Sequence, residues 1–286
     1  MISDITLGQF FPGRSLIHKL DPRTKIILAV LFIVAVFVAN NPLTFLLLGM
    51  TALILVAVSR ISFKVVLKSV KPIVFILLFT AIINVFMTKG NGAPLLSFWI
   101  IEIYEEGIVR AVMMALRVLI LIIGTSILLT YTTSPISLTD GLESLLSPLK
   151  KIKVPVQTFA MMMSIALRFI PTLVEETEKI MNAQKSRGAD FSSGSLIQRA
   201  KSLIPILIPL FVSSFKRAEE LATAMECRCY RGDQNRTKLV KLEYKTADVL
   251  FILVFILFLA ALICLSTLPY SYGIGNSILK LMFYKV

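Results

Sequence analysis

Long apolar stretches separated by short polar segments dominate the chain. A helix that crosses a bilayer needs about 20 mostly apolar residues, and four stretches meet that need: 25–39 with its flanks, 72–88, 107–131 and 247–268. Residues 43–59 form a fifth, which the helix-breaking sequence Ala-Asn-Asn-Pro separates from the first. The pattern therefore predicts five transmembrane helices, of which the first two form a hairpin.

A long insertion before the last span has a different pattern. Its first part, 137–155, has leucines at helical spacing after a Ser/Thr/Asp start signal and ends in lysines, which predicts a short helix lying flat on the membrane. Two long helices follow, from about Val156 to Arg187 and from about Ser195 to Tyr230. Each begins apolar and turns polar, so one end favours membrane or protein and the other favours water.

The apolar halves of the two long helices are poor candidates for further spans. Arg168 lies well inside the first, and the apolar run between Lys201 and Lys216 in the second is short for a span. Such runs are typical of buried or interfacial helices, so we expect five spans and keep seven as the alternative.

Composition and charge support this interpretation. Of the 286 residues 56% are hydrophobic, and the mean hydropathy is +0.83, far outside the range of soluble domains. Lys and Arg are retained on the cytoplasmic side of membrane proteins. With the N-terminus inside, the inner segments carry 25 of them and the outer segments 3. The N-terminus and the insertion are thus predicted to be cytoplasmic and the C-terminus to be outside.

The predicted fold is an all-α polytopic membrane protein with three parts. Residues 1–131 hold transmembrane helices 1–4, and residues 132–246 form a cytoplasmic coupling domain of one short and two long helices. Residues 247–286 hold the last transmembrane helix and an outer tail. The net charge of +13 partly reflects contact of the coupling domain with anionic lipid headgroups.

Both long helices end on an arginine. Arg187 lies in Ala-Gln-Lys-Ser-Arg-Gly, and Arg228 lies in Ala-Met-Glu-Cys-Arg-Cys. A basic last turn and a following glycine, Gly188 or Gly232, are ordinary at a helix C-terminus. The repetition at corresponding positions favours a further role, because a guanidinium suits a carboxylate and two such tips would suit two equivalent acidic grooves.

Few polar residues lie within the predicted spans. Arg110 and Arg117 share one face of the fourth span, and we expect the deeper Arg117 to pair with a partner such as Asn84 in a structural link rather than an ion pathway. Asp21 is expected to cap the first span ahead of Pro22. The three cysteines have no metal-binding spacing and are predicted to be free thiols.

Four sequence blocks together resemble a known family. They are LDPRTKIIL at 20–28, ALRFIPTLVEE at 166–176, AQKSRGADF at 183–191 and AMECRCYRG at 224–232. In this order they resemble the transmembrane T component of energy-coupling-factor transporters, a family related to the cobalt transporter permease. The resemblance covers nearly the whole chain.

The resemblance implies partners and docking residues. In that family each cytoplasmic tip carries an Ala-Arg-Gly motif that inserts into a groove of one of two ABC-type ATPase subunits. The corresponding residues here are Ser186, Arg187, Gly188, Cys227, Arg228 and Cys229. Two alanines and one glycine of the motifs are replaced, by Ser186, Cys227 and Cys229. The partner ATPases would bind ATP and Mg, so no cofactor and no metal are expected in this chain, which has no GxxxxGK[ST] sequence.

The expected function is the coupling of the two ATPases to a membrane-embedded substrate-binding subunit, for uptake of a vitamin or other micronutrient across a prokaryotic cell membrane. A platform for that subunit is expected on the apolar halves of the long helices, at Met161, Met162, Met163, Pro205, Leu207 and Pro209. A self-contained secondary carrier is the alternative, but it should show internal repeats and interrupted spans. A membrane enzyme would need paired carboxylates or metal ligands, whereas the acidic residues here are scattered. No nucleic-acid partner is expected.

Overall fold

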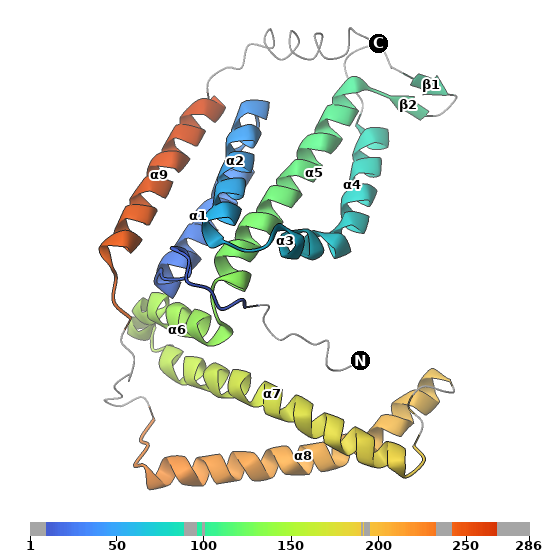
Figure 1. The fold of residues 1–286 in the computed structure, drawn as a ribbon, viewed down its shortest axis with the longest axis vertical. Coiled ribbons are helices and arrows are strands. Elements are labelled where there is room, and N and C mark those ends of the chain that lie inside the picture. Colours follow the sequence, from blue (N-terminus) through green and yellow to red (C-terminus); the bar gives the residue numbers. More distant parts are fainter. Residues whose placement is uncertain are drawn as a thin grey trace. The chain divides into compact units, whose positions relative to one another are not determined.

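The computed structural model describes residues 10–88, 96–98, 101–189, 191, 195–232 and 242–267. The chain divides into two compact units. We call Phe10–Ser134 with Glu243–Val286 the membrane unit, and Pro135–Leu242 with Met1–Gln9 the coupling unit. Helices dominate the described residues of both units (Figure 1), so the predicted all-α polytopic fold is confirmed.

The membrane unit is a helical bundle with one short hairpin. In chain order its elements are α1 (Pro22–Val38), α2 (Pro42–Ser59), α3 (Phe63–Val70), the 3-10 turn η1 (Lys71–Ile73), α4 (Val74–Met87), β1 (Leu96–Phe98), β2 (Ile101–Ile103), α5 (Glu105–Thr125), the π-helical turn η2 (Ser126–Tyr131) and α9 (Thr246–Thr267). The two strands are antiparallel and pair Leu96 with Ile103. The sequence pattern did not predict this hairpin, which is too short to change the fold class.

The third predicted span is preceded by a helix that runs in another direction. The span was expected from residue 72, and α4 begins at Val74. Before it, α3 runs crosswise to the upright helices α2, α4 and α5 (Figure 1). Pro72 lies in η1, between α3 and α4. Proline lacks a backbone donor and its ring clashes with the preceding turn, so it accounts for the change of direction.

The set of helices able to cross a membrane differs from the prediction at one place. Five segments of the described chain are long and apolar enough: Pro42–Ser59, Phe63–Met87, Gly107–Tyr131, Val156–Ser186 and Thr246–Thr267. Four of them coincide with predicted spans. The other predicted span, α1, has 17 residues, or roughly 26 Å against a hydrocarbon core of about 30 Å. By length and composition α7 (Val156–Ser186) takes its place, with the lowest mean hydropathy of the five, 1.3, and with Arg168 inside it.

The core of the membrane unit forms around α1. This helix packs on α2, α5 and α9, and the side chains of Phe32, Ala35 and Val36 are fully buried. Phe32 lies on α5 at Gly124, where a Cβ atom would fall on the phenyl ring. Glycine at this position therefore lets the two helices approach each other.

The coupling unit consists of helices whose bounds are close to those predicted. They are α6 (Pro135–Leu145), the 3-10 turn η3 (Ser147–Ile152), α7 (Val156–Ser186) and α8 (Leu196–Cys227). A capping box of Ser195 and Gln198 begins α8. Pro205 and Pro209 lie inside α8, and its first turns run in a different direction from the remainder (Figure 1).

The contact between Phe32 and Gly124 can be tested by substitution. We expect Gly124→Ala to destabilise the protein by about 1–3 kcal/mol, because the added methyl overpacks a full core. The measurement is thermal unfolding of the detergent-purified protein. Gly49→Ala is the matched control, since a Cβ there meets no atom within 4 Å. Phe32→Leu in the Gly124→Ala background should restore part of the loss, and equal melting of the two glycine variants would contradict the contact.

Candidate functional site

The tip of α7 ends in a hydrogen-bonded cap. The helix ends at Ser186, and Arg187 is its C-cap residue. Gly188 has a φ of +85°, and its N–H donates to the carbonyl of Lys185 at 2.9 Å. The N–H of Ala189 donates to the carbonyl of Gln184 at 3.0 Å. These two bonds form a Schellman motif, which satisfies carbonyls that the helix itself leaves free.

The tip of α8 repeats this cap, with Arg228 at the position of Arg187. The N–H of Cys229 donates to the carbonyl of Glu226 at 2.8 Å, and that of Tyr230 to the carbonyl of Met225 at 3.1 Å. Cys229 has a φ of 59°, so it occupies the left-handed position that Gly188 holds in the other tip. A side chain there costs about 1–2 kcal/mol relative to glycine.

The interpretation of Gly232 as the cap glycine of α8 is wrong. Gly232 has a positive φ of 73°, but Cys229 closes the helix three residues earlier. The sequence rule favours glycine at this position, and here the hydrogen bonds of the motif hold a cysteine in its place.

The two arginines are equivalent in backbone geometry. Arg187 has φ −89° and ψ 8°, and Arg228 has φ −90° and ψ 15°. Both side chains are exposed, and neither takes part in an ion pair within the described residues. The neighbours Ser186 and Cys227 are exposed as well. Each tip thus presents a guanidinium group and a small side chain next to a tight backbone turn.

An ion pair joins the polar halves of the two long helices. Arg217 of α8 donates through Nη2 to Oε2 of Glu176 in α7 at 2.8 Å, and both side chains are partly exposed. The sequence analysis did not single out this pair. Charged residues are frequent on the polar faces of both helices, and only the way in which the helices pack selects these two.

The predicted platform residues lie on exposed apolar surface. Met162 and Met163 of α7 are 53% and 40% exposed, and Leu207 of α8 is 58% exposed. Met161 is half-buried, and Pro205 and Pro209 are exposed. Between them Ile206 is buried, at 3%. Much of the apolar surface of both helices is therefore uncovered in the isolated chain.

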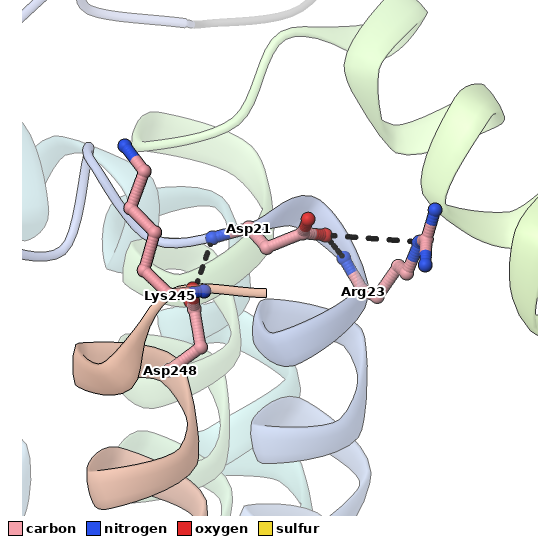
Figure 2. Close-up of polar contacts among 4 residues, drawn as sticks. All are labelled: Asp21, Arg23, Lys245 and Asp248. Carbon is pink, nitrogen blue, oxygen red and sulfur yellow. Dashed lines mark hydrogen bonds and ion pairs between the residues drawn. The ribbon is translucent and has the colours of Figure 1, made fainter. Parts of the chain in front are cut away.

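A second polar arrangement, in the membrane unit, joins the starts of α1 and α9 (Figure 2). Asp21 caps α1 as predicted, since its Oδ1 accepts from the N–H of Arg23 at 2.9 Å. Asp248 is 1% exposed. It accepts from the N–H of Asp21 through Oδ1 and from the N–H of Lys245 through Oδ2, both at 2.8 Å. One carboxylate thus binds backbone donors at the starts of two helices.

Lys25 extends this arrangement to the end of η2. Its side chain is 2% exposed, and its Nζ donates to the carbonyl of Thr132 at 2.8 Å. The sequence analysis identified neither this lysine nor Asp248 as part of a site. Their 223-residue separation hides the connection, which only the packing of α1 beside α9 reveals.

The expected pairing of Arg117 with Asn84 is wrong. Arg117 donates through Nη2 to the carbonyl of Ala39 at 2.7 Å, and its guanidinium lies over the ring of Phe45. Asn84 donates to the carbonyl of Thr80 in its own helix. Ala39 is the C-cap of α1, whose last turn has no basic residue. The free carbonyls at a helix C-terminus attract a cation, and this position satisfies Arg117 better than a neutral amide.

The described residues offer little for redox or metal chemistry. Cys227, Cys229 and Cys264 are free and exposed, as predicted. Within the same residues there is no group of three or more His, Cys, Asp or Glu side chains that could hold a metal ion.

Comparison with known proteins agrees with the family resemblance of the four sequence blocks. The family model CbiQ, described as cobalt transport protein, matches residues 13–239. The chain is 57% identical over 250 residues to an energy-coupling factor transporter transmembrane protein EcfT of Ruminiclostridium cellulolyticum, covering 87% of this chain and 92% of that protein. The proteins of the same name from Clostridium kluyveri and Bacillus subtilis are 53% and 49% identical, covering 94% and 92% of this chain and 97% and 98% of theirs.

The bridge formed by Asp248 generates a prediction. We expect Asp248→Ala to destabilise the protein by about 1–3 kcal/mol, because the buried N–H of Asp21 loses its acceptor, while the partly buried N–H of Lys245 adds less. Asp248→Asn should be milder, because one carbonyl oxygen remains to accept. Thermal unfolding of the purified protein measures the effect, with the exposed Glu219→Ala as control. The bridge would have no structural importance if Asp248→Ala and Glu219→Ala melted alike.

Proposed function

Because the chain belongs to the CbiQ family and is the transmembrane component of an energy-coupling factor transporter, we propose that it couples ATP hydrolysis by two partner ATPases to solute uptake through a separate membrane-embedded binding subunit. The chain has no P-loop sequence, so hydrolysis falls to the partners. The solute would be a vitamin or another micronutrient, selected by the binding subunit.

The observation that carries this proposal is the equivalence of the two tips. Arg187 and Arg228 occupy the same position in two Schellman motifs, with φ and ψ that differ by only a few degrees. Two equivalent basic tips suit two equivalent acidic grooves, as a pair of like ATPase subunits would offer. Arginine is well suited to such a contact, because its planar guanidinium can bind a carboxylate through two parallel hydrogen bonds.

The long helices would carry movement from the tips to the apolar halves. At 31 and 32 residues each is roughly 47 Å long. The ion pair between Glu176 and Arg217 joins them between the tips and the apolar halves, which favours their moving as one body. An exposed ion pair contributes only about 0.2–1 kcal/mol. It would therefore favour one relative orientation of α7 and α8 without fixing it rigidly.

The exposed apolar surface of the coupling unit would receive the binding subunit. Met162, Met163 and Leu207 contribute to it, and the flexible, polarizable methionine side chain adapts to differently shaped partners. Pro205 and Pro209 shape the surface through the changed direction of α8. Several different binding subunits could use the same platform.

Charge reversal at the tips tests the docking of the ATPases. We expect Arg187→Glu or Arg228→Glu to weaken ATPase association by about 2–5 kcal/mol, because an interface carboxylate then faces another carboxylate. ATP-driven uptake should fall with it, while the protein still inserts in the membrane. The measurements are pull-down of the ATPases and uptake in proteoliposomes. Arg199→Glu, an exposed reversal near the start of α8, is the matched control.

The cysteines of the second tip give an independent readout. Cys227 and Cys229 are exposed and should react with a water-soluble maleimide in the isolated chain, then become protected when the ATPases are added. Labelling is located by mass spectrometry. If both charge reversals left association unchanged, and ATPases gave no protection, the tips would not be the docking site.

A second substitution tests the platform. We expect Leu207→Arg or Met162→Arg to release the binding subunit and to leave both ATPases attached, because a charge placed on an apolar interface must be desolvated. Ile197→Arg, at another exposed apolar position of α8, should retain every subunit. The measurement is a pull-down with all components expressed. If both Leu207→Arg and Met162→Arg retained the binding subunit, its contact would lie elsewhere.

A further inference from the structure

The membrane unit has an apolar groove between α2, α3 and α5. Its volume is about 490 Å³, and its lining is almost entirely apolar. Along α2 it extends from Pro42 past Gly49 to Val56, which is roughly 21 Å at 1.5 Å per residue. Gly49 deepens it, because a Cβ at this position would meet no atom within 4 Å. The groove is thus longer than one leaflet of a bilayer is deep, about 15 Å.

Basic side chains gather at the α3 end of this groove. Phe63 and Val66 of α3 line the groove. Lys64 follows Phe63 about 100° around the helix, and with Lys68 it forms the side of α3 that faces away from the groove. Arg60, the left-handed C-cap of α2, precedes them. Arg60, Lys64 and Lys68 are exposed, and neither ion pair of the described residues includes them.

The apolar lining and the basic residues that follow it in the chain together suit a lipid. An acyl chain can lie along the groove, and a phosphate attached to it would lie near Arg60 and Lys64. The positive charge distribution predicts that this end faces the cytoplasm, where the leaflet is rich in anionic lipids.

We propose that this groove binds one anionic phospholipid, with an acyl chain along Gly49 and the headgroup phosphate at Arg60 and Lys64. The crosswise α3 contributes to both parts of the site, because Phe63 and Val66 line the groove and Lys64 meets the headgroup together with Arg60 of α2. The site lies wholly in the membrane unit and does not depend on docking of the ATPases or the binding subunit.

Native mass spectrometry of the full-length protein in detergent tests the proposal. The protein is delipidated and offered equimolar phosphatidylglycerol and phosphatidylcholine with identical acyl chains. We expect one phosphatidylglycerol to be retained in preference. Each of Arg60→Gln and Lys64→Gln should reduce that preference about fivefold, while Arg14→Gln and Lys19→Gln, exposed basic positions away from the groove, should not.

Substitution inside the groove separates this site from ordinary lipid contact. Gly49→Phe should abolish retention, whereas Ile54→Phe, at an exposed position of α2 outside the lining, should leave it unchanged. Melting temperatures measured without lipid confirm that both variants fold. Equal retention of the two lipids, or retention by Gly49→Phe, would overturn the proposal. So would loss of the binding subunit in Gly49→Phe with lipid retention intact, which would identify a protein-docking groove.

Discussion

The ends of helices leave backbone groups without partners inside the helix, and a protein that lies largely in hydrocarbon must satisfy them from within. The membrane unit meets this constraint with charged side chains from distant parts of the chain. Asp248 accepts from backbone donors at the starts of both α1 and α9. Arg117 donates to the carbonyl at the end of α1. The first helix is thus held at both ends by other helices, which gives its short length a stable place in the bundle.

The tips of the two long helices meet the same requirement locally, since both α7 and α8 close with a Schellman motif. Because each cap consists of backbone hydrogen bonds, the arginine side chain is not needed to close the helix. The side chains of Arg187 and Arg228 therefore stay exposed, whereas Arg117 binds a carbonyl within its own fold. The contrast between these arginines follows from how each helix end is closed.

Two apolar surfaces of the chain are exposed. Apolar surface on α7 and α8 is exposed at Met162 and Leu207, and a second apolar surface lines the groove beside α2. The first belongs to long helices with polar ends, which favours a protein partner. The second ends near Arg60 and Lys64, which favours a lipid. The neighbouring polar groups, rather than hydrophobicity alone, distinguish the two surfaces.

The sequence by itself determined the class of the protein, most of its spans, the two long helices and the positions of both tip arginines. These features depend on local patterns, namely the length of apolar runs, helical periodicity and breaks at Asn41 and Pro42. Packing decided the rest. The partners of Arg117, Asp248 and Arg217 lie 78, 227 and 41 residues away along the chain, counting from Ala39, Asp21 and Glu176. The left-handed conformation of Cys229 and the crosswise α3 were also seen only in three dimensions. Each of these side chains has many chemically suitable partners in the sequence, and it binds the one that lies near it. Which distant segments lie near each other is a property of the tertiary structure.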